Sequence, residues 1–127
     1  MARTFAGRDW QARVMGDTAS NATGSYASAT FIGLTADTTA PSTASTVLTG
    51  ELTGGTMGRA QATYAHTNGT ASYTLTRNFT SDRNVVAAKI GIFNAISGGT
   101  LCFETMLDAT ADLKNGDTIQ IVETVTL

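Results

Sequence analysis

A long apolar stretch with a glycine turn in its middle places the strongest constraint on the fold. It covers residues 85–107 and is interrupted at 97–100 by Ser-Gly-Gly-Thr. Two apolar runs around a Gly-Gly pair are typical of a β-hairpin, because glycine adopts the positive φ angles that a two-residue loop requires. The sequence therefore predicts an antiparallel hairpin at the centre of a β-sheet.

A two-residue loop at residues 98–99 would fix the register of this hairpin. Ile90 would then face Leu107 on one side of the hairpin, and Lys89 would face Asp108 on the other. Apolar side chains gather on one face and opposite charges meet on the other, as a correct register should give.

A second hairpin is predicted around Asn68 and Gly69, a pair that tolerates the backbone of a tight turn. Its strands would cover residues 59–67 and 70–80, with Tyr64 opposite Tyr73. One face would be apolar and the other rich in threonine, which indicates an antiparallel sheet with one side in water.

Two further strands and one long loop complete the expected domain. Residues 29–35 are apolar on both faces, as in a central or interface strand, and residues 118–127 form the last strand. Glu123 falls on the apolar face of that last strand, so we expect it to pair with an arginine of this subunit or the next. Residues 36–58 should form a long loop that is available as a contact surface. Val47, Leu48 and Leu52 should hold it on the core, as one turn of helix or as a short strand.

Short strands with turn signals and no helical stretch predict an all-β fold. We expect an antiparallel β-sandwich, jelly-roll or Ig-like, over residues 29–127, preceded by an extended N-terminal arm and linker over residues 1–28. The chain has 127 residues, the size of one domain.

The N-terminal segment allows two interpretations. Arg3, Arg8 and Arg13 recur at a five-residue spacing that fits neither a helix face nor a strand face. The segment is either a solvated terminus or an arm that docks on a neighbouring subunit, and the only tryptophan of the chain, Trp10, favours docking. The candidate interface residues are Arg3, Phe5, Arg8, Trp10, Arg13, Phe31, Ile32 and Leu34.

No chemistry of a known kind is visible in the sequence. The single histidine and single cysteine make a zinc site improbable, and neither a phosphate-binding loop nor a nucleophile elbow is present. Asp108, Asp112 and Asp117 offer the oxygen ligands of calcium without an EF-hand spacing. We expect no enzymatic activity and no cofactor.

Composition narrows the range of partners. The net charge of −2 gives no basic footprint for nucleic acid, and no apolar run is long enough to span a membrane. Charged residues make up only 14% of the chain, against a typical value of about 25%. A surface with so few charges is poorly protected against self-association. We therefore expect much of the surface to be covered in a homo-oligomer, with a trimer favoured.

Four segments carry a resemblance to a known class of proteins: FIGLTADTTAPSTASTVLTGEL, RAQATYAHTNGTASYTLTRNF, KIGIFNAISGGTLCFETML and GDTIQIVETVTL. Together they resemble small virion proteins of tailed bacteriophages, described as head-decoration or tail-fibre-like proteins. The resemblance covers residues 31–127 and leaves the first 28 residues outside it. It implies a β-sandwich assembly protein without enzymatic activity.

Three functions follow from these observations. The first is a capsid decoration, or minor capsid, protein that binds the major capsid protein and stabilises the outer shell of a virion assembled in the host cytoplasm. The second is a tail, baseplate or tail-fibre component. The third, from another class, is a carbohydrate-binding module whose exposed rings would come from Trp10, Tyr26, Tyr64 and Tyr73.

Overall fold

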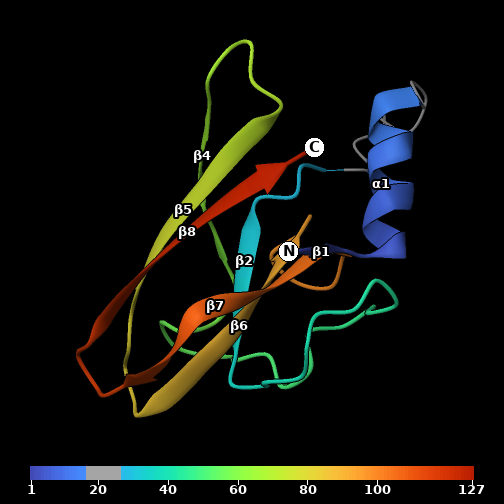
Figure 1. Cartoon of the computed structure of the whole chain (residues 1–127). Helices are drawn as coiled ribbons and strands as arrows, with labels where there is room; N and C mark the ends of the chain where they lie inside the picture. Colours follow the sequence, from blue (N-terminus) through green and yellow to red (C-terminus); the bar gives the residue numbers. More distant parts are fainter. Residues whose placement is uncertain (17–26) are drawn as a thin grey trace.

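The computed structural model of the chain describes residues 1–16 and 27–127, and over these residues it is built mainly of antiparallel β-sheet (Figure 1). The elements are β1 (Ala2–Arg3), α1 (Phe5–Gly16), β2 (Phe31–Thr35), β3 (Ala60–Gln61), β4 (Thr63–His66), β5 (Ser72–Thr80), β6 (Val85–Phe93), β7 (Leu101–Leu113) and β8 (Thr118–Thr126). The larger sheet has the order β1-β7-β6-β2-β3 and the smaller sheet the order β4-β5-β8. The predicted all-β class is confirmed, and α1 is an exception to the expected absence of helix.

Both sheets contribute to one hydrophobic core. One face of the smaller sheet is buried, because apolar side chains on its strands alternate with side chains that point away. In the larger sheet β2 and β6 are buried on both faces. The largest buried side chains are Ile32, Leu34, Met57, Leu75, Phe79, Ile90, Ile92, Phe103, Ile121 and Val125. Of these, Met57 comes from the loop between β2 and β3 and not from a strand.

The central hairpin is present, but its register differs from the prediction by two residues. Ile90 faces Thr105 instead of Leu107, and Lys89 faces Met106 instead of Asp108. Gly98 and Gly99 do have positive φ angles of 62° and 70°. The connection is longer than two residues, however, and runs from residue 94 to residue 100. A shift of two residues keeps Ile90, Ile92 and Phe103 on their expected common face, so the pattern alone could not reveal it. Leu101 is the exception, because a bulge between Ile92 and Phe93 places it on the other face, beside Phe93.

The second hairpin is likewise shifted by two residues, and its first strand is divided between the sheets. Tyr64 faces Leu75, and Tyr73 faces His66. β3 pairs with β2 in the larger sheet, whereas β4 pairs with β5 in the smaller one. The chain passes from one sheet to the other at Ala62, whose amide donates to the carbonyl of Thr30 at 2.8 Å.

The prediction of an extended N-terminal arm is wrong for residues 5–16, which form α1. The Thr4 hydroxyl accepts a hydrogen bond from the Gly7 amide at 2.8 Å, as expected of a residue that caps a helix N-terminus. The same hydroxyl donates to the carbonyl of Leu101 in β7 at 2.6 Å. Twelve residues are too few for a stable isolated helix in water, so the contact with β7 accounts for its formation.

Gly7 sets the distance between α1 and β7. A Cβ atom at this position would lie 2.2 Å from the carbonyl oxygen of Cys102, so only glycine lets the two backbones approach this closely. A Cβ at Gly16, at the other end of the helix, would meet nothing within 4 Å.

We expect Gly7→Ala to lower the free energy of unfolding by about 1–2 kcal/mol. Overpacking costs about 1–3 kcal/mol, and the higher helix propensity of alanine returns less than about 1 kcal/mol of it. Gly16→Ala is the matched control and should leave stability unchanged within about 0.5 kcal/mol. Urea denaturation of both variants tests this, and equal stabilities would show that α1 does not pack closely on β7.

Candidate functional site

The candidate interface residues of β2 are occupied within the chain itself. Ile32 and Leu34 are completely buried in the core, and Phe31 packs against Leu48 and Phe93. Ile32 and Leu34 therefore have no side-chain surface left for a partner, and their assignment to an interface is corrected. β2 is apolar on both faces because the core covers one face and the loop after β2 covers the other.

The arginines among the N-terminal candidates contact other residues of the N-terminal segment. Arg3 Nη1 donates to Gln11 Oε1 at 2.8 Å, Arg13 pairs with Asp9 at 2.9 Å, and the guanidinium of Arg8 lies 5.7 Å from the centre of the Phe5 ring. The Phe5 side chain is 60% exposed. Phe5, Arg8 and Arg13 are thus on the surface, and their role in docking stays a prediction.

Trp10 lines a groove between α1 and the smaller sheet. Its indole Nε1 donates to the carbonyl of Ala27 at 2.9 Å. The groove has a volume of about 410 Å³ and a mainly apolar lining: Trp10, Val14, Ser28, Ala29, Thr30, Tyr64, Tyr73 and Leu127. The Tyr64 and Tyr73 rings are 5.4 Å apart, and burial raises the pKa of Tyr73 to about 12. Three of the four rings proposed for glycan binding therefore meet here, while Tyr26 lies outside the described residues.

Residues 36–58, here called the covering loop, cover the outer face of the larger sheet at Leu48 and reach into the main core at Met57. Leu48 packs on Phe93 and Leu101, and the amide of Leu52 donates to the carbonyl of Leu34 at 2.8 Å. The inward packing predicted for Leu48 and Leu52 is confirmed, whereas the prediction is wrong for Val47, which is exposed. Neither a helical turn nor a strand forms at Val47 and Leu48. The loop buries apolar side chains that would otherwise need a second subunit to cover them.

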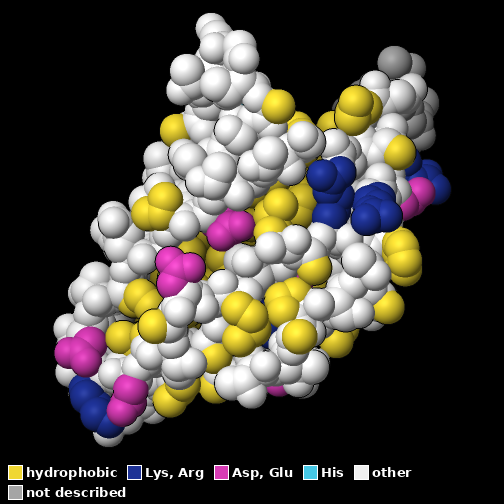
Figure 2. Space-filling view, in the orientation of Figure 1, with side chains coloured by type: hydrophobic (Ala, Val, Ile, Leu, Met, Phe, Trp, Pro, Cys, Tyr) yellow, Lys and Arg dark blue, Asp and Glu magenta, His cyan; other side chains and the backbone are white. Residues whose placement is uncertain are grey.

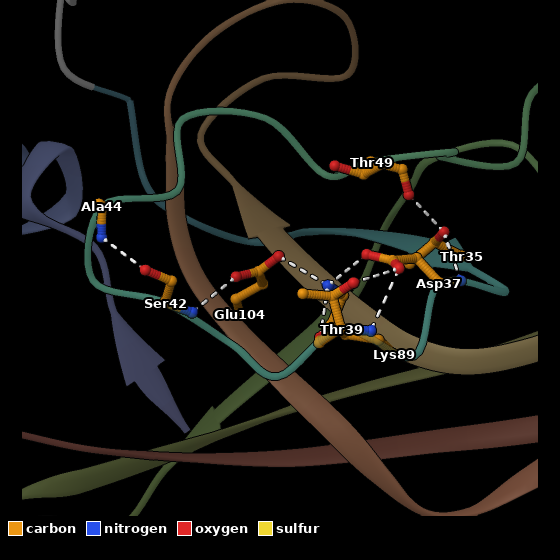
Figure 3. Close-up of polar contacts among 8 residues, drawn as sticks. All are labelled: Thr35, Asp37, Thr39, Ser42, Ala44, Thr49, Lys89 and Glu104. Atoms are coloured by element: carbon orange, nitrogen blue, oxygen red, sulfur yellow. Dashed lines mark hydrogen bonds and ion pairs between the residues drawn. The ribbon is translucent and has the colours of Figure 1, made fainter.

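A buried lysine fixes the first half of the covering loop to the sheet (Figure 3). Lys89 Nζ of β6 lies 2.9 Å from Asp37 Oδ2 and 3.1 Å from Glu104 Oε1 of β7, and it donates to the carbonyl of Thr39 at 3.0 Å. The other carboxylate oxygen of Glu104 accepts the amide of Ser42 at 3.2 Å. One cation thus joins two strands and the loop.

Each charge of this group depends on the others. The side chains of Lys89 and Glu104 are only 3% and 2% exposed. Burial opposes the charge on Lys89, but the hydrogen bonds to Asp37 and Glu104 outweigh it and raise its pKa. The hydrogen bond from Lys89, followed by those from Thr39, lowers the pKa of Asp37 to about 2.

Arg59 fixes the second half of the covering loop. Its guanidinium makes two hydrogen bonds to Glu51, at 2.7 and 2.9 Å, and lies 3.4 Å from the centre of the Phe93 ring. It also donates to the carbonyls of Ala95 and Gly98 in the β6–β7 connection. A bidentate, stacked arginine of this kind holds its neighbours in one geometry.

The outer face of the smaller sheet has no such cover among the described residues. Strand pairing places twelve uncharged side chains on it: Thr63, Ala65, Ser72, Thr74, Thr76, Asn78, Thr80, Thr118, Gln120, Val122, Thr124 and Thr126. The threonine-rich face is therefore confirmed. Such a face carries no charge that would repel a partner.

The described part of the chain offers no obvious site for metal chemistry. No three His, Cys, Asp or Glu side chains of residues 1–16 and 27–127 come together as a possible metal site. Asp112 and Asp117 instead bind the Nζ and the amide of Lys114, and His66 Nδ1 bonds to Ser72. Cys102 is buried, and burial raises the pKa of its thiol to about 12, far from the reactive range.

Comparisons of the chain with protein-family models, with curated proteins and with solved structures found no match. No helix among the described residues is long and apolar enough to cross a membrane.

We expect Lys89→Met to lower the free energy of unfolding by about 3 kcal/mol, because it leaves the Glu104 carboxylate buried without its cation. Adding Glu104→Gln should restore part of this loss. Lys114→Met is the control, since that lysine pairs with Asp112 on the surface and should matter by less than about 0.5 kcal/mol. Equal losses at positions 89 and 114 in chemical denaturation would contradict the structural role of Lys89.

Asp37→Asn should destabilise the protein in a pH-dependent way. The folded-state pKa of Asp37 is about 2, below the value of about 3.9 for an unfolded aspartate, so its contribution is complete above pH 4. The difference between wild type and variant should shrink as the pH falls from about 4 to about 2. Urea unfolding across this range measures it, and a constant difference would show that Asp37 is not paired with Lys89.

Proposed function

We propose that the protein is a structural component of a tailed-phage virion. In the first form of the proposal it is a capsid decoration protein that binds the outer shell as a homo-oligomer, with a trimer favoured. The observation that carries the proposal is the uncharged outer face of the smaller sheet, which no described residue covers and which suits assembly better than a free existence. The resemblance of residues 31–127 to phage virion proteins supports the virion as the place of assembly.

We further propose that the two sheets form a β-sandwich of modified Ig-like order. With β1 set aside, the strands β2 to β8 correspond in number to the strands A to G of an Ig domain. An Ig domain has the order A-B-E-D in one sheet, whereas the corresponding order here is β3-β2-β6-β7. The first two strands are exchanged, and the sixth, β7, takes the place of the fourth, β5, beside β6. The shared core of both sheets supports this assignment.

The proposed partner is the major capsid protein or another virion protein. Chemistry plays no part in this function, so neither a cofactor nor an active site is required. The exposed side of α1, with Phe5, Arg8 and Arg13, supplies aromatic and arginine anchors of the kind that dominate protein interfaces.

A tail, baseplate or fibre component is the first alternative, since it would use the same surfaces. A carbohydrate-binding module is the second, and the aromatic groove favours it. Trp10, Tyr64 and Tyr73 line one apolar groove of about 410 Å³, a size suited to a small ligand.

Quantitative mass spectrometry and cryo-electron microscopy of purified virions test the function. We expect on the order of hundreds of copies of the protein on the head, because closed symmetric oligomers would repeat over the whole shell. A handful of copies at the tail would select the first alternative. The second alternative, a carbohydrate-binding module, would replace the proposal if two results were found together. The protein would be absent from virions, and it would bind a glycan in a way that Tyr64→Ala abolishes.

A further inference from the structure

The two sheets expose strand edges along the side formed by β7 and β8. β8 is an edge strand of the smaller sheet and pairs with β5 over its whole length, from Thr118 to Thr126. β7 is paired on its outer side only with β1, at Phe103 and Glu104. In the described part of the chain, the other edge of β8 and most of the outer edge of β7 therefore have unpaired backbone groups.

The two edges are not equally open to another strand. In β7 the pairing jumps from Lys89–Met106 to Ala87–Ala111, so residues 107–110 bulge out of the ladder. A bulge of this size prevents another strand from pairing regularly with β7. In other proteins, proline or lysine residues protect an edge strand from such pairing. β8 contains neither proline nor lysine and has no irregularity in its nine residue pairs with β5. β8 is consequently the edge that can accept a strand.

A groove of about 250 Å³ lies between the bulge and β8. Its lining includes Leu107, Asp108 and Ala109 from β7 and Ile119, Ile121 and Glu123 from β8. Figure 2 shows acidic side chains among apolar ones over β7 and β8, whereas the larger basic patches lie near α1 and the β7–β8 turn. The groove thus combines apolar contact area with negative charge.

Glu123 has no ion-pair partner among the described residues. It makes neither an ion pair nor a side-chain hydrogen bond with another described residue, so the expected arginine of the same subunit is not found. Burial raises the pKa of Glu123, the N-terminal amine opposes this rise, and the negative charge of Asp108 adds a smaller increase. A half-buried carboxylate beside a second carboxylate favours a ligand that brings a positive charge.

We infer that β8 is the docking edge for an extended segment of a partner protein, which pairs with β8 as an added strand and places a lysine or arginine against Glu123. Strand addition uses the free backbone groups for affinity and alternate side chains for specificity. A second copy of β8 fits poorly, because its only charged residue is another Glu123. The inference adds a binding mode to the proposed assembly function. It rests on that proposal only for the identity of the partner, a virion protein.

The test uses the full chain and a synthetic probe, the peptide Val-Thr-Val-Thr-Arg-Thr-Val-Thr. Its control carries citrulline, the uncharged isostere of arginine. In NMR titrations of the ¹⁵N-labelled protein, we expect the arginine peptide to shift the amide signals of β8 and to bind about tenfold more tightly than the citrulline peptide, the ratio for one additional charge-assisted contact.

Three variants locate the effect. Glu123→Gln should abolish the preference for arginine, and Val122→Lys, at a side chain that is 57% exposed, should weaken both peptides by placing a charge at the edge. Asp112→Asn removes a carboxylate of β7 that does not line the groove and should preserve the preference. Thermal melting confirms that each variant is folded.

Equal binding of the two peptides, an undiminished preference in Glu123→Gln, or no shift in β8 at the highest soluble peptide concentration would overturn the inference. Protection of the β8 amides in a dimer without peptide would assign the edge to a second copy instead. Loss of virion attachment with an intact peptide preference would defeat the proposed function alone. Attachment without that preference would defeat only the inference.

Discussion

The buried charge of Lys89 is the interaction on which the arrangement of the larger sheet depends. It lies on the central hairpin, and its partners come from the opposing strand and from the covering loop. Removing charges from water is costly, so the group is stable only because Glu104, Asp37 and the carbonyl of Thr39 surround the ammonium together. The first half of the loop is held in place as a result.

This arrangement explains how a chain with one short helix covers the larger sheet. The outer face of that sheet carries Phe31, Phe93 and Leu101, and Leu48 packs on them from the covering loop. Arg59 holds the other end of the loop through Glu51 and the Phe93 ring. The smaller sheet has no equivalent loop among the described residues, and its outer face is threonine-rich instead of apolar. The outer face of the larger sheet is thus covered by a loop, whereas that of the smaller sheet is polar and exposed. The smaller sheet and its β8 edge are therefore the surfaces suited to assembly.

The N-terminal helix shows why local pattern can mislead. Two of its twelve residues are glycine, and its arginines follow no helical spacing. The residues that make this helix possible are Thr4, which caps the first turn, and Gly7, which allows the close approach to Cys102. Both residues act through β7, almost a hundred positions away in the sequence, so neither could be interpreted without the fold.

The sequence by itself determined the all-β class, the two hairpins and the face that most strand residues turn to the core, with Leu101 as an exception. These features follow from alternation of apolar and polar residues and from glycine turns, both of which act over short distances. The tertiary structure alone decided the registers, the division of residues 59–67 between two sheets, and the partners of Lys89 and Arg59. A register shift of two residues preserves the pattern, and an ion pair between residues 52 positions apart leaves no periodic trace. The open groove beside Glu123 exists for the same reason, because it depends on where the β7 bulge lies relative to β8.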